Sequence, residues 1–192
     1  MVGILLPPSI AGALVNFAAL TLGKIPVNLN YTLTNEGIAS CARQCNIQTV
    51  ITSKAFCERV HVEIPGQAIM LEELAQNPRA GEKIGALLKS WLMPVGMLER
   101  NLRDRGRKTQ LDDVATIIFS SGSTGEPKGV MLTHYNIGSN VEQLTQCFAL
   151  AKTDRILGVL PFFHSFGFTG TMALPLIAGV GAVYHPSPLD AR

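Results

Sequence analysis

The sequence predicts an α/β fold with a mainly parallel sheet flanked by helices. Short apolar segments rich in β-branched residues alternate along the chain with longer segments that carry helix-capping signals, an order typical of βαβ units. The 192 residues are 47% hydrophobic and 16% charged, which is a globular composition. No internal repeat or low-complexity linker divides the chain, so we expect a single lobe over residues 1–192.

The first quarter of the chain shows the alternation most clearly. Residues 3–6 predict a short apolar strand, and Pro7 and Pro8 separate it from a helix that has Ser9 as N-cap and Gly23 just after its end. That helix is apolar nearly all round, so we expect it to be buried. The next predicted elements are a strand at 25–29, a helix at 34–45 and a strand at 49–52.

Residues 79–108 form an unusually basic segment. They hold eight Lys or Arg and three Asp or Glu, whereas the whole chain carries a net charge of only +2, so nucleic acid is not an expected partner. Apolar residues recur there with helical spacing at Ile84, Leu87, Leu88, Trp91 and Leu92. This pattern, ended by Pro94, predicts an amphipathic helix that either covers the domain's own sheet or binds a membrane surface or partner.

The cysteines give no sign of a metal site. Cys41, Cys45, Cys57 and Cys147 lack the paired C-x-x-C spacing of zinc ligands. Free thiols are typical of a reducing compartment, so we expect a cytoplasmic protein with no metal ligand set among these residues.

The most informative segment follows a predicted strand at 114–119. Its sequence is SSGSTGEPKG, residues 120–129. A loop of this kind presents backbone N–H groups and hydroxyls to a polyphosphate, with Lys128 as the cation. Gly122 and Gly125 permit close approach of the backbone, and Pro127 stiffens the segment that carries Lys128.

Two better-known motifs do not fit this loop. In a Walker A alignment Pro127 stands where the second glycine is required and Gly129 replaces the Mg²⁺-binding hydroxyl, which disfavours P-loop NTPase or kinase chemistry. A nucleophile elbow fails because Ser121 occupies the first glycine position before Ser123. A serine hydrolase with His164 as base, or a merely flexible turn, remain as alternatives to phosphate binding.

Regular structure resumes after the loop. Thr133 has the position of an N-cap, and the helix after it has an apolar face formed by Ile137, Val141, Leu144 and Phe148. Residues 156–160 predict a further strand. That strand leads into a loop rich in Phe and Gly.

Three stretches of the chain resemble motifs of the adenylate-forming superfamily, whose members are also called AMP-binding or acyl-activating enzymes. The phosphate-binding signature resembles TIIFSSGSTGEPKGVMLTH, residues 116–134. An earlier core motif is similar to LTLGKIPVNLNYTLTNEGI, residues 20–38, and the substrate-pocket motif to LPFFHSFGFTGTMALPLIAGVGAVY, residues 160–184. Within the superfamily, the resemblance is greatest to the bacterial group of bifunctional acyl-[acyl-carrier-protein] synthetase / 2-acylglycerophosphoethanolamine acyltransferases.

The resemblance implies an ATP-dependent acyl ligase. Such enzymes use ATP and Mg²⁺ to activate a carboxylate as acyl-adenylate and then pass the acyl group to an acceptor. For this chain the implied acid is a fatty acid, the implied acceptor is acyl carrier protein or CoA, and the implied role is phospholipid acylation. The family's main Mg²⁺-binding Glu, ribose-binding Asp and C-terminal domain with a catalytic Lys lie in later segments. We therefore expect an excised part of the large N-terminal domain, inactive by itself.

The resemblance also assigns roles to individual residues. The β- and γ-phosphates of ATP are assigned to Ser120, Ser121, Gly122, Ser123, Thr124, Gly125 and Lys128. His164 matches the pocket histidine near the reacting carboxylate and is the candidate catalytic residue. Phe163, Phe166 and Gly167 are the candidate substrate-pocket residues.

The expected location is the cytoplasm, with peripheral contact to the inner face of the bacterial inner membrane through residues 83–98. Two other functions remain open. One is a non-catalytic lipid- or membrane-binding module in which the phosphate loop is idle. The other is a ligase for an aryl or amino acid.

Overall fold

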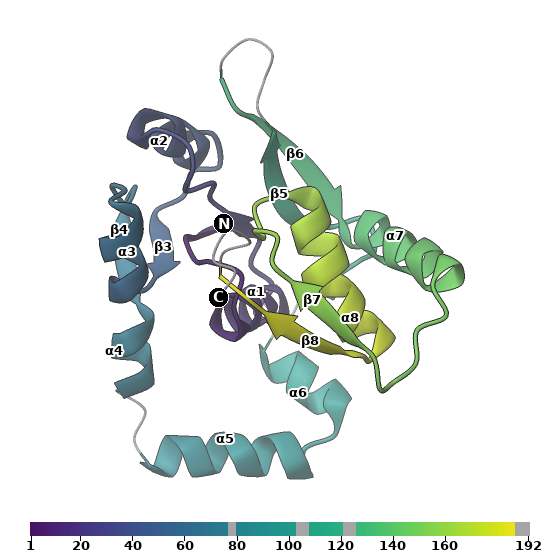
Figure 1. The fold of residues 1–192 in the computed structure, drawn as a ribbon. Helices are drawn as coiled ribbons and strands as arrows, with labels where there is room; N and C mark the ends of the chain where they lie inside the picture. Colours follow the sequence, from purple (N-terminus) through teal and green to yellow (C-terminus); the bar gives the residue numbers. More distant parts are fainter. Residues whose placement is uncertain (77–79, 103–107, 121–125, 187–192) are drawn as a thin grey trace.

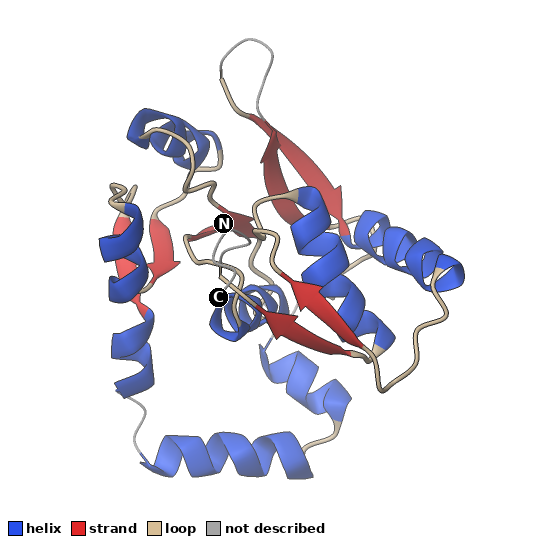
Figure 2. Cartoon of the chain, in the orientation of Figure 1, coloured by secondary structure: helices blue, strands red, loops and turns tan. Residues whose placement is uncertain are grey.

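The largest sheet is four-stranded and wholly parallel, with the strand order β2-β1-β3-β4. The structure, a computed structural model, describes residues 1–76, 80–102, 108–120 and 126–186. The strands of this sheet are β1 (Val2–Ile4), β2 (Pro26–Asn28), β3 (Thr49–Thr52) and β4 (Gln67–Met70). Helices connect consecutive strands, so the predicted α/β fold with a mainly parallel sheet is confirmed (Figures 1 and 2).

Hydroxyl side chains start the first three helices of this half. The helices are α1 (Ile10–Thr21), α2 (Asn35–Gln44), α3 (Lys54–Val60) and α4 (Leu71–Gln76). The side chains of Ser9, Thr34 and Ser53 accept hydrogen bonds from N–H groups in the first turns of α1, α2 and α3. Each bond satisfies a backbone donor that has no partner within the helix.

Helix α1 is buried on one face only. Its buried residues are Gly12, Ala13, Asn16 and Ala19. On the opposite face Ile10 is 69% exposed and Leu14 is 61% exposed. The expectation that this helix is buried is therefore wrong for the face that carries Ile10 and Leu14, because the described part of the chain packs against only one side of α1.

Strands β5 (Val114–Ser120) and β6 (Lys128–Thr133) form an antiparallel hairpin. The sequence predicted β5 but not β6, and it placed Lys128 in a loop. The hydroxyl of Thr116 donates a buried hydrogen bond of 2.8 Å to the carbonyl of Pro26, which joins β5 to β2. The hairpin is thus fastened to the edge of the parallel sheet.

The C-terminal part contains α7 (His134–Cys147), β7 (Arg155–Gly158), the π-helical segment η2 (Gly167–Ala173), α8 (Leu174–Ala178) and β8 (Gly181–Tyr184). Thr133 and Asn136 form a capping box at the start of α7, which confirms the predicted cap. Strands β7 and β8 pair in parallel. The segment predicted as a Phe- and Gly-rich loop is largely helical, since η2 continues directly into α8.

Two hydrophobic cores meet at β5. Ile117 and Phe119 belong to the core around α2 and the parallel sheet, whereas Ala115 and Ile118 belong to the core around α7, η2 and α8. A strand turns successive side chains to opposite faces, and a register shift of the β5–β6 ladder between Val114 and Thr116 changes the alternation at Ala115, so one strand serves both cores. The end of β5 consequently lies where the two halves of the structure adjoin.

Helices α5 (Ala80–Leu92) and α6 (Val95–Leu102) follow the predicted amphipathic pattern and the predicted break at Pro94. The apolar face of α5 is open to solvent, from 50% exposure at Leu88 to 85% at Trp91. The interpretation that this face covers the domain's own sheet is wrong for the described residues; α5 lies apart from the sheets at the bottom of Figure 1. No helix in the described ranges is long and apolar enough to span a membrane.

Candidate functional site

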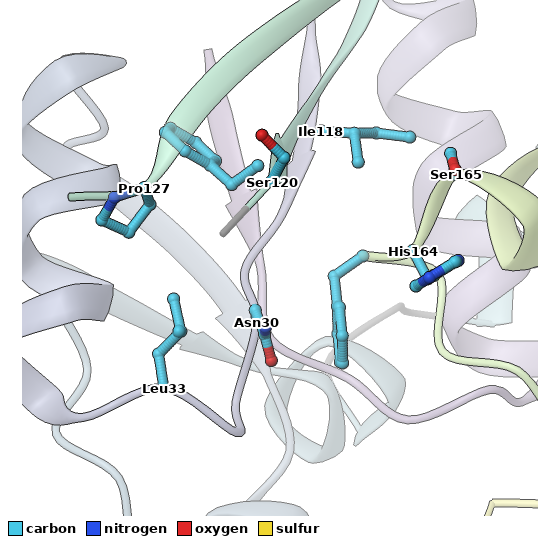
Figure 3. A pocket seen from close by; sticks show the side chains of 9 residues that line it. Asn30, Leu33, Ile118, Ser120, Pro127, His164 and Ser165 are labelled. Carbon is cyan, nitrogen blue, oxygen red and sulfur yellow. The ribbon is translucent and has the colours of Figure 1, made fainter. Parts of the chain in front are cut away.

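A cavity of about 270 Å³ lies where the end of β5 meets the segments that follow β2 and precede η2. Its lining residues are Asn30, Leu33, Ile118, Phe119, Ser120, Pro127, Phe163, His164 and Ser165. Figure 3 shows Leu33 and Pro127 on one side and His164 and Ser165 on the other. The three stretches that carry the family resemblance, 20–38, 116–134 and 160–184, therefore converge on one cavity.

The described ends of the phosphate-loop segment lie opposite each other. Ser120 is the last residue of β5, Lys128 is the first residue of β6, and the two are register partners in the hairpin. Both are exposed, and Ser120 also lines the cavity. Ser121, Gly122, Ser123, Thr124 and Gly125 lie outside the described residues. The structure thus brings a hydroxyl and a cation to the base of the predicted phosphate loop.

Gln44, which the sequence analysis did not single out, holds the base of this segment. Its side-chain amide Nε2 donates to the carbonyl of Pro127 at 3.0 Å. Gln44 is the last residue of α2 and lies 83 residues from Pro127 in sequence. No local pattern signals such a contact, because it depends on how α2 packs beside the hairpin.

His164 occupies the cavity wall from a fixed turn before η2. Its backbone N–H donates to the carbonyl of Pro161 at 3.0 Å, and its own carbonyl accepts from the N–H of Phe168 at 2.8 Å. The side chain is exposed, so it is accessible to a ligand in the cavity. Beside it Ser165, another residue that the sequence analysis missed, lines the same cavity.

The candidate pocket residues do not all share this cavity. Phe163 lines it and packs edge-to-face on Tyr31, with ring centroids 4.9 Å apart. Burial raises the pKa of Tyr31, with Arg59 acting in the opposite direction, so the phenol stays neutral as an aromatic support. Phe166 lines a second cavity of about 320 Å³, formed with residues of β6, α7 and η2. Ser165 lines both cavities and marks their boundary.

Gly167 lines neither cavity but shapes the turn between them. A Cβ atom at this position would lie 2.1 Å from the carbonyl oxygen of Pro161, a distance that no side chain tolerates. The carbonyl of Gly167 accepts a buried hydrogen bond of 2.6 Å from the hydroxyl of Thr171. Gly167 thus allows η2 to start close behind the segment that carries His164.

The donor set around the cavity fits an anionic ligand. Lys128 supplies a positive charge beside Ser120, and none of the residues that line the cavity is acidic. Lysine and hydroxyl donors are the side chains that commonly hold phosphate oxygens. No group of three or more His, Cys, Asp or Glu residues suited to a metal ion occurs in the part of the chain that the structure describes.

Curated relatives with significant similarity include several ligases. The chain is 44% identical over 90 residues to malonate–CoA ligase ACSF3 of Bos taurus, a match that covers 47% of this chain and 14% of that protein. It is 38% identical over 82 residues to a long-chain-fatty-acid–CoA ligase of Bacillus subtilis (strain 168), covering 41% and 15%. The matches therefore span only a small part of the length of these relatives.

Solved structures share the fold. O-succinylbenzoate coenzyme A synthetase of Bacillus subtilis, in complex with ATP and magnesium ion, has a TM-score of 0.73 and 23% identity, covering 97% of this chain and 34% of that one. ATP-bound MatB of Rhodopseudomonas palustris has a TM-score of 0.70 and 18% identity, covering 97% and 35%. These similarities establish a common architecture over nearly all of the chain.

A family model described as "AMP-binding enzyme" matches residues 1–192. The match includes all three stretches that line the cavity. The predicted superfamily is therefore confirmed, and the chain belongs to the AMP-binding enzyme family.

Proposed function

We propose that this chain is part of the large N-terminal domain of an ATP-dependent ligase that activates a carboxylic acid as acyl-adenylate and passes the acyl group to a thiol. The observation that carries the proposal is the placement of Ser120 and Lys128 opposite each other beside the cavity that holds His164. Relatives named as CoA ligases, and a structural neighbour that holds ATP and magnesium, support it.

In this proposal the chain contributes positioning and electrostatics. Residues 120–125 and Lys128 hold the β- and γ-phosphates of ATP, and Lys128 stabilises the charge that develops on the leaving pyrophosphate. ATP supplies the electrophilic α-phosphorus, and Mg²⁺ is held mainly by a ligand outside these 192 residues. His164 orients the reacting carboxylate, Phe163 and Phe166 form walls of the two adjoining cavities that receive the acid, and Gly167 shapes the turn between them.

A fatty acid is the proposed acid, and acyl carrier protein or CoA is the proposed acceptor. Relatives named as a long-chain-fatty-acid–CoA ligase and a medium-chain-fatty-acid–[acyl-carrier-protein] ligase support both acceptors. We place the reaction in phospholipid acylation. A ligase for an aryl or amino acid is the competing assignment, and a panel of fatty, aryl and amino acids tested on the longer protein distinguishes the two.

ATP binding is the decisive test of the phosphate site. Calorimetry on the 192-residue chain, with and without Mg²⁺, should show binding that weakens by about 1 to 3 kcal/mol in Lys128→Ala, because a charged donor is lost. Lys152→Ala is the matched control, since Lys152 is an exposed lysine in the turn after α7. Absence of ATP binding, or an equal loss in both variants, contradicts the proposal.

We propose that the 192 residues bind nucleotide without completing adenylation. The catalytic Lys and the main Mg²⁺ ligand expected from the family resemblance are not in this sequence. The chain should therefore show no exchange of labelled pyrophosphate into ATP when a fatty acid is added. Acid-dependent exchange by this chain would overturn that part of the proposal.

A second function, attachment to an anionic membrane surface, is favoured by the open apolar face of α5. A shallow, largely apolar groove where α5 meets α6 is lined by Leu88, Lys89, Leu92, Met93, Pro94 and Met97. At about 3.6 residues per turn, Lys83 and Lys89 lie on the two flanks of the apolar face. Helices that lie in a membrane interface have this combination of apolar face and flanking cations. We assign the inner face of the bacterial inner membrane as the target.

Vesicle flotation tests this surface. The chain should float with vesicles that contain phosphatidylglycerol and less with pure phosphatidylcholine, and Trp91→Glu should abolish flotation. Ile10→Glu is the matched control, because Ile10 is 69% exposed on a different helix. Equal loss in both variants, or no flotation, refutes the membrane surface. Flotation by a chain that does not bind ATP favours the non-catalytic module over the ligase.

A further inference from the structure

The side chain of Gln44 spans the gap between α2 and the base of the phosphate-loop segment. Its Nε2 donates to the carbonyl of Pro127 at 3.0 Å and lies 3.3 Å from the hydroxyl of Ser40. A carbonyl oxygen only accepts hydrogen bonds, so the amide NH₂, and not the amide oxygen, faces Pro127. The two partners leave the amide of Gln44 with one favourable orientation.

The bonded carbonyl belongs to the peptide group that supplies the N–H of Lys128. A peptide group is planar, so the direction of the Pro127 carbonyl also determines the direction of the Lys128 N–H. Pro127 is buried and its ring fixes φ, whereas Lys128 is exposed. The hydrogen bond from Gln44 therefore orients the Pro127–Lys128 peptide group. Lys128, whose N–H belongs to this peptide, is the first residue of β6 and carries the cationic side chain.

Gln44 can hold this peptide because α2 and the hairpin share one core. Cys41, Ala42 and Cys45 of the α2 segment are buried in the same hydrophobic cluster as Ile117 and Phe119 of β5. On β6, a Cβ atom at Gly129 would lie 3.0 Å from Ile117 and 3.3 Å from the Phe119 ring, so the backbone packs closely on that core. The donor and the acceptor are thus both fixed to β5.

We propose that Gln44 is a positioning residue for the phosphate site: by bonding to Pro127 it orients the Pro127–Lys128 peptide so that the backbone N–H and ammonium of Lys128 meet a polyphosphate. The inference rests on the proposed function for the ligand and on the structure for the contact. It predicts that a residue distant in sequence, which does not itself touch the nucleotide, tunes nucleotide affinity.

Hydrogen exchange tests the contact without nucleotide. In Gln44→Met, which keeps the side-chain length but removes both donors, backbone amides within 126–130 should exchange about 2- to 12-fold faster, the range expected for one hydrogen bond. The exchange rates of the backbone amides of α7 should not change. Gln48→Met is the matched control, because Gln48 is also exposed and lies near the end of α2. Unchanged exchange at 126–130, or the same change in the control, overturns the inference.

ATP affinity tests the consequence. The dissociation constant for ATP, measured well below the melting transition of each variant, should rise by the same 2- to 12-fold in Gln44→Met, and at least as much in Gln44→Glu, which places a carboxylate against the Pro127 carbonyl. Faster exchange with unchanged ATP affinity overturns the positioning role. If the wild-type chain does not bind ATP, the proposed function fails, and with it the role toward a polyphosphate, whereas the exchange result still decides whether Gln44 orders the peptide.

Discussion

Asn16 and Asn28 bond to each other through both of their side-chain amides. Asn28 Nδ2 donates to Asn16 Oδ1 at 2.8 Å, and Asn16 Nδ2 donates to Asn28 Oδ1 at 3.1 Å. Both residues are buried, and Asn16 also donates to the carbonyl of Gly12. The pair locks α1 to β2, the strand that leads into the Asn30 wall of the cavity.

Breaking this pair should destabilise the fold strongly. Asn16→Leu leaves the amide of Asn28 buried without its partner, at a cost of about 1 to 3 kcal/mol for each unsatisfied group. The double variant Asn16→Leu/Asn28→Leu should lose less than the sum of the single variants, because the orphaned group is removed. Urea denaturation followed by circular dichroism measures both effects. Additive losses would show that the two amides do not act as a pair.

The buried bond between Thr116 and Pro26 gives a second stability prediction. Thr116→Val keeps the shape of the side chain but removes the hydroxyl that donates to the Pro26 carbonyl. We expect a loss of about 1 to 3 kcal/mol in the free energy of unfolding. Thr145→Val is a suitable control, since the Thr145 hydroxyl bonds to Glu142 on the exposed side of α7 and its loss should cost little.

Replacement of Gly167 should disrupt the turn beneath His164. In Gly167→Ala the new Cβ would collide with the Pro161 carbonyl, so the backbone must shift and the melting temperature should fall. Gly138→Ala should keep or raise the melting temperature, because nothing lies within 4 Å of a Cβ there and alanine favours the helix by about 1 kcal/mol. Similar melting temperatures for the two variants would refute the close approach at Gly167.

The cysteines should differ sharply in reactivity. Cys147 is exposed, whereas Cys41 and Cys45 are buried, and burial raises the pKa values of both buried thiols. Because the thiolate is the reactive form, iodoacetamide at pH 8 should modify Cys147 in the folded chain and spare Cys41 and Cys45. Mass spectrometry of the peptides reports the sites. Rapid modification of Cys41 without unfolding would contradict the packing of α2.

Stability should fall at alkaline pH partly through Cys41. Burial, with a smaller contribution from Cys45, raises the Cys41 pKa from 9.0 to about 11 in the folded chain. The unfolded thiol ionises first, so the contribution of Cys41 is complete below pH 9 and is lost as the pH rises toward about 11. Urea midpoints measured from pH 8 to pH 11 should fall less steeply in Cys41→Ala than in the wild-type chain.

The sequence predicted elements whose signals are local. Ser9 and Thr133 were identified as N-caps, and each side chain accepts the expected bond from the first turn of its helix. Strand β3 matches its predicted bounds because its β-branched residues are flanked by polar ones. Capping and β-propensity act within a few residues, which is why they can be inferred from a single sequence.

The elements that depend on distant parts of the chain were missed. Strand β6 is exposed along most of its length and forms because β5 offers it an antiparallel partner. Helix η2 contains glycines that disfavour helix in isolation, and close packing behind Pro161 stabilises it there. The sequence also could not show that Gln44 contacts Pro127 or that Asn30 and His164 line one cavity, because both arrangements arise from tertiary packing.

The exposed face of α5 has a consequence for spectroscopy. Trp91 is the single tryptophan of the sequence and is 85% exposed. Its emission should already have the long wavelength of a water-exposed indole in the folded chain, so unfolding by urea should hardly shift it. The emission maximum of Trp91 should shift to shorter wavelength when an apolar surface covers α5. Tryptophan fluorescence will therefore report binding at α5 and will change little when the two hydrophobic cores unfold.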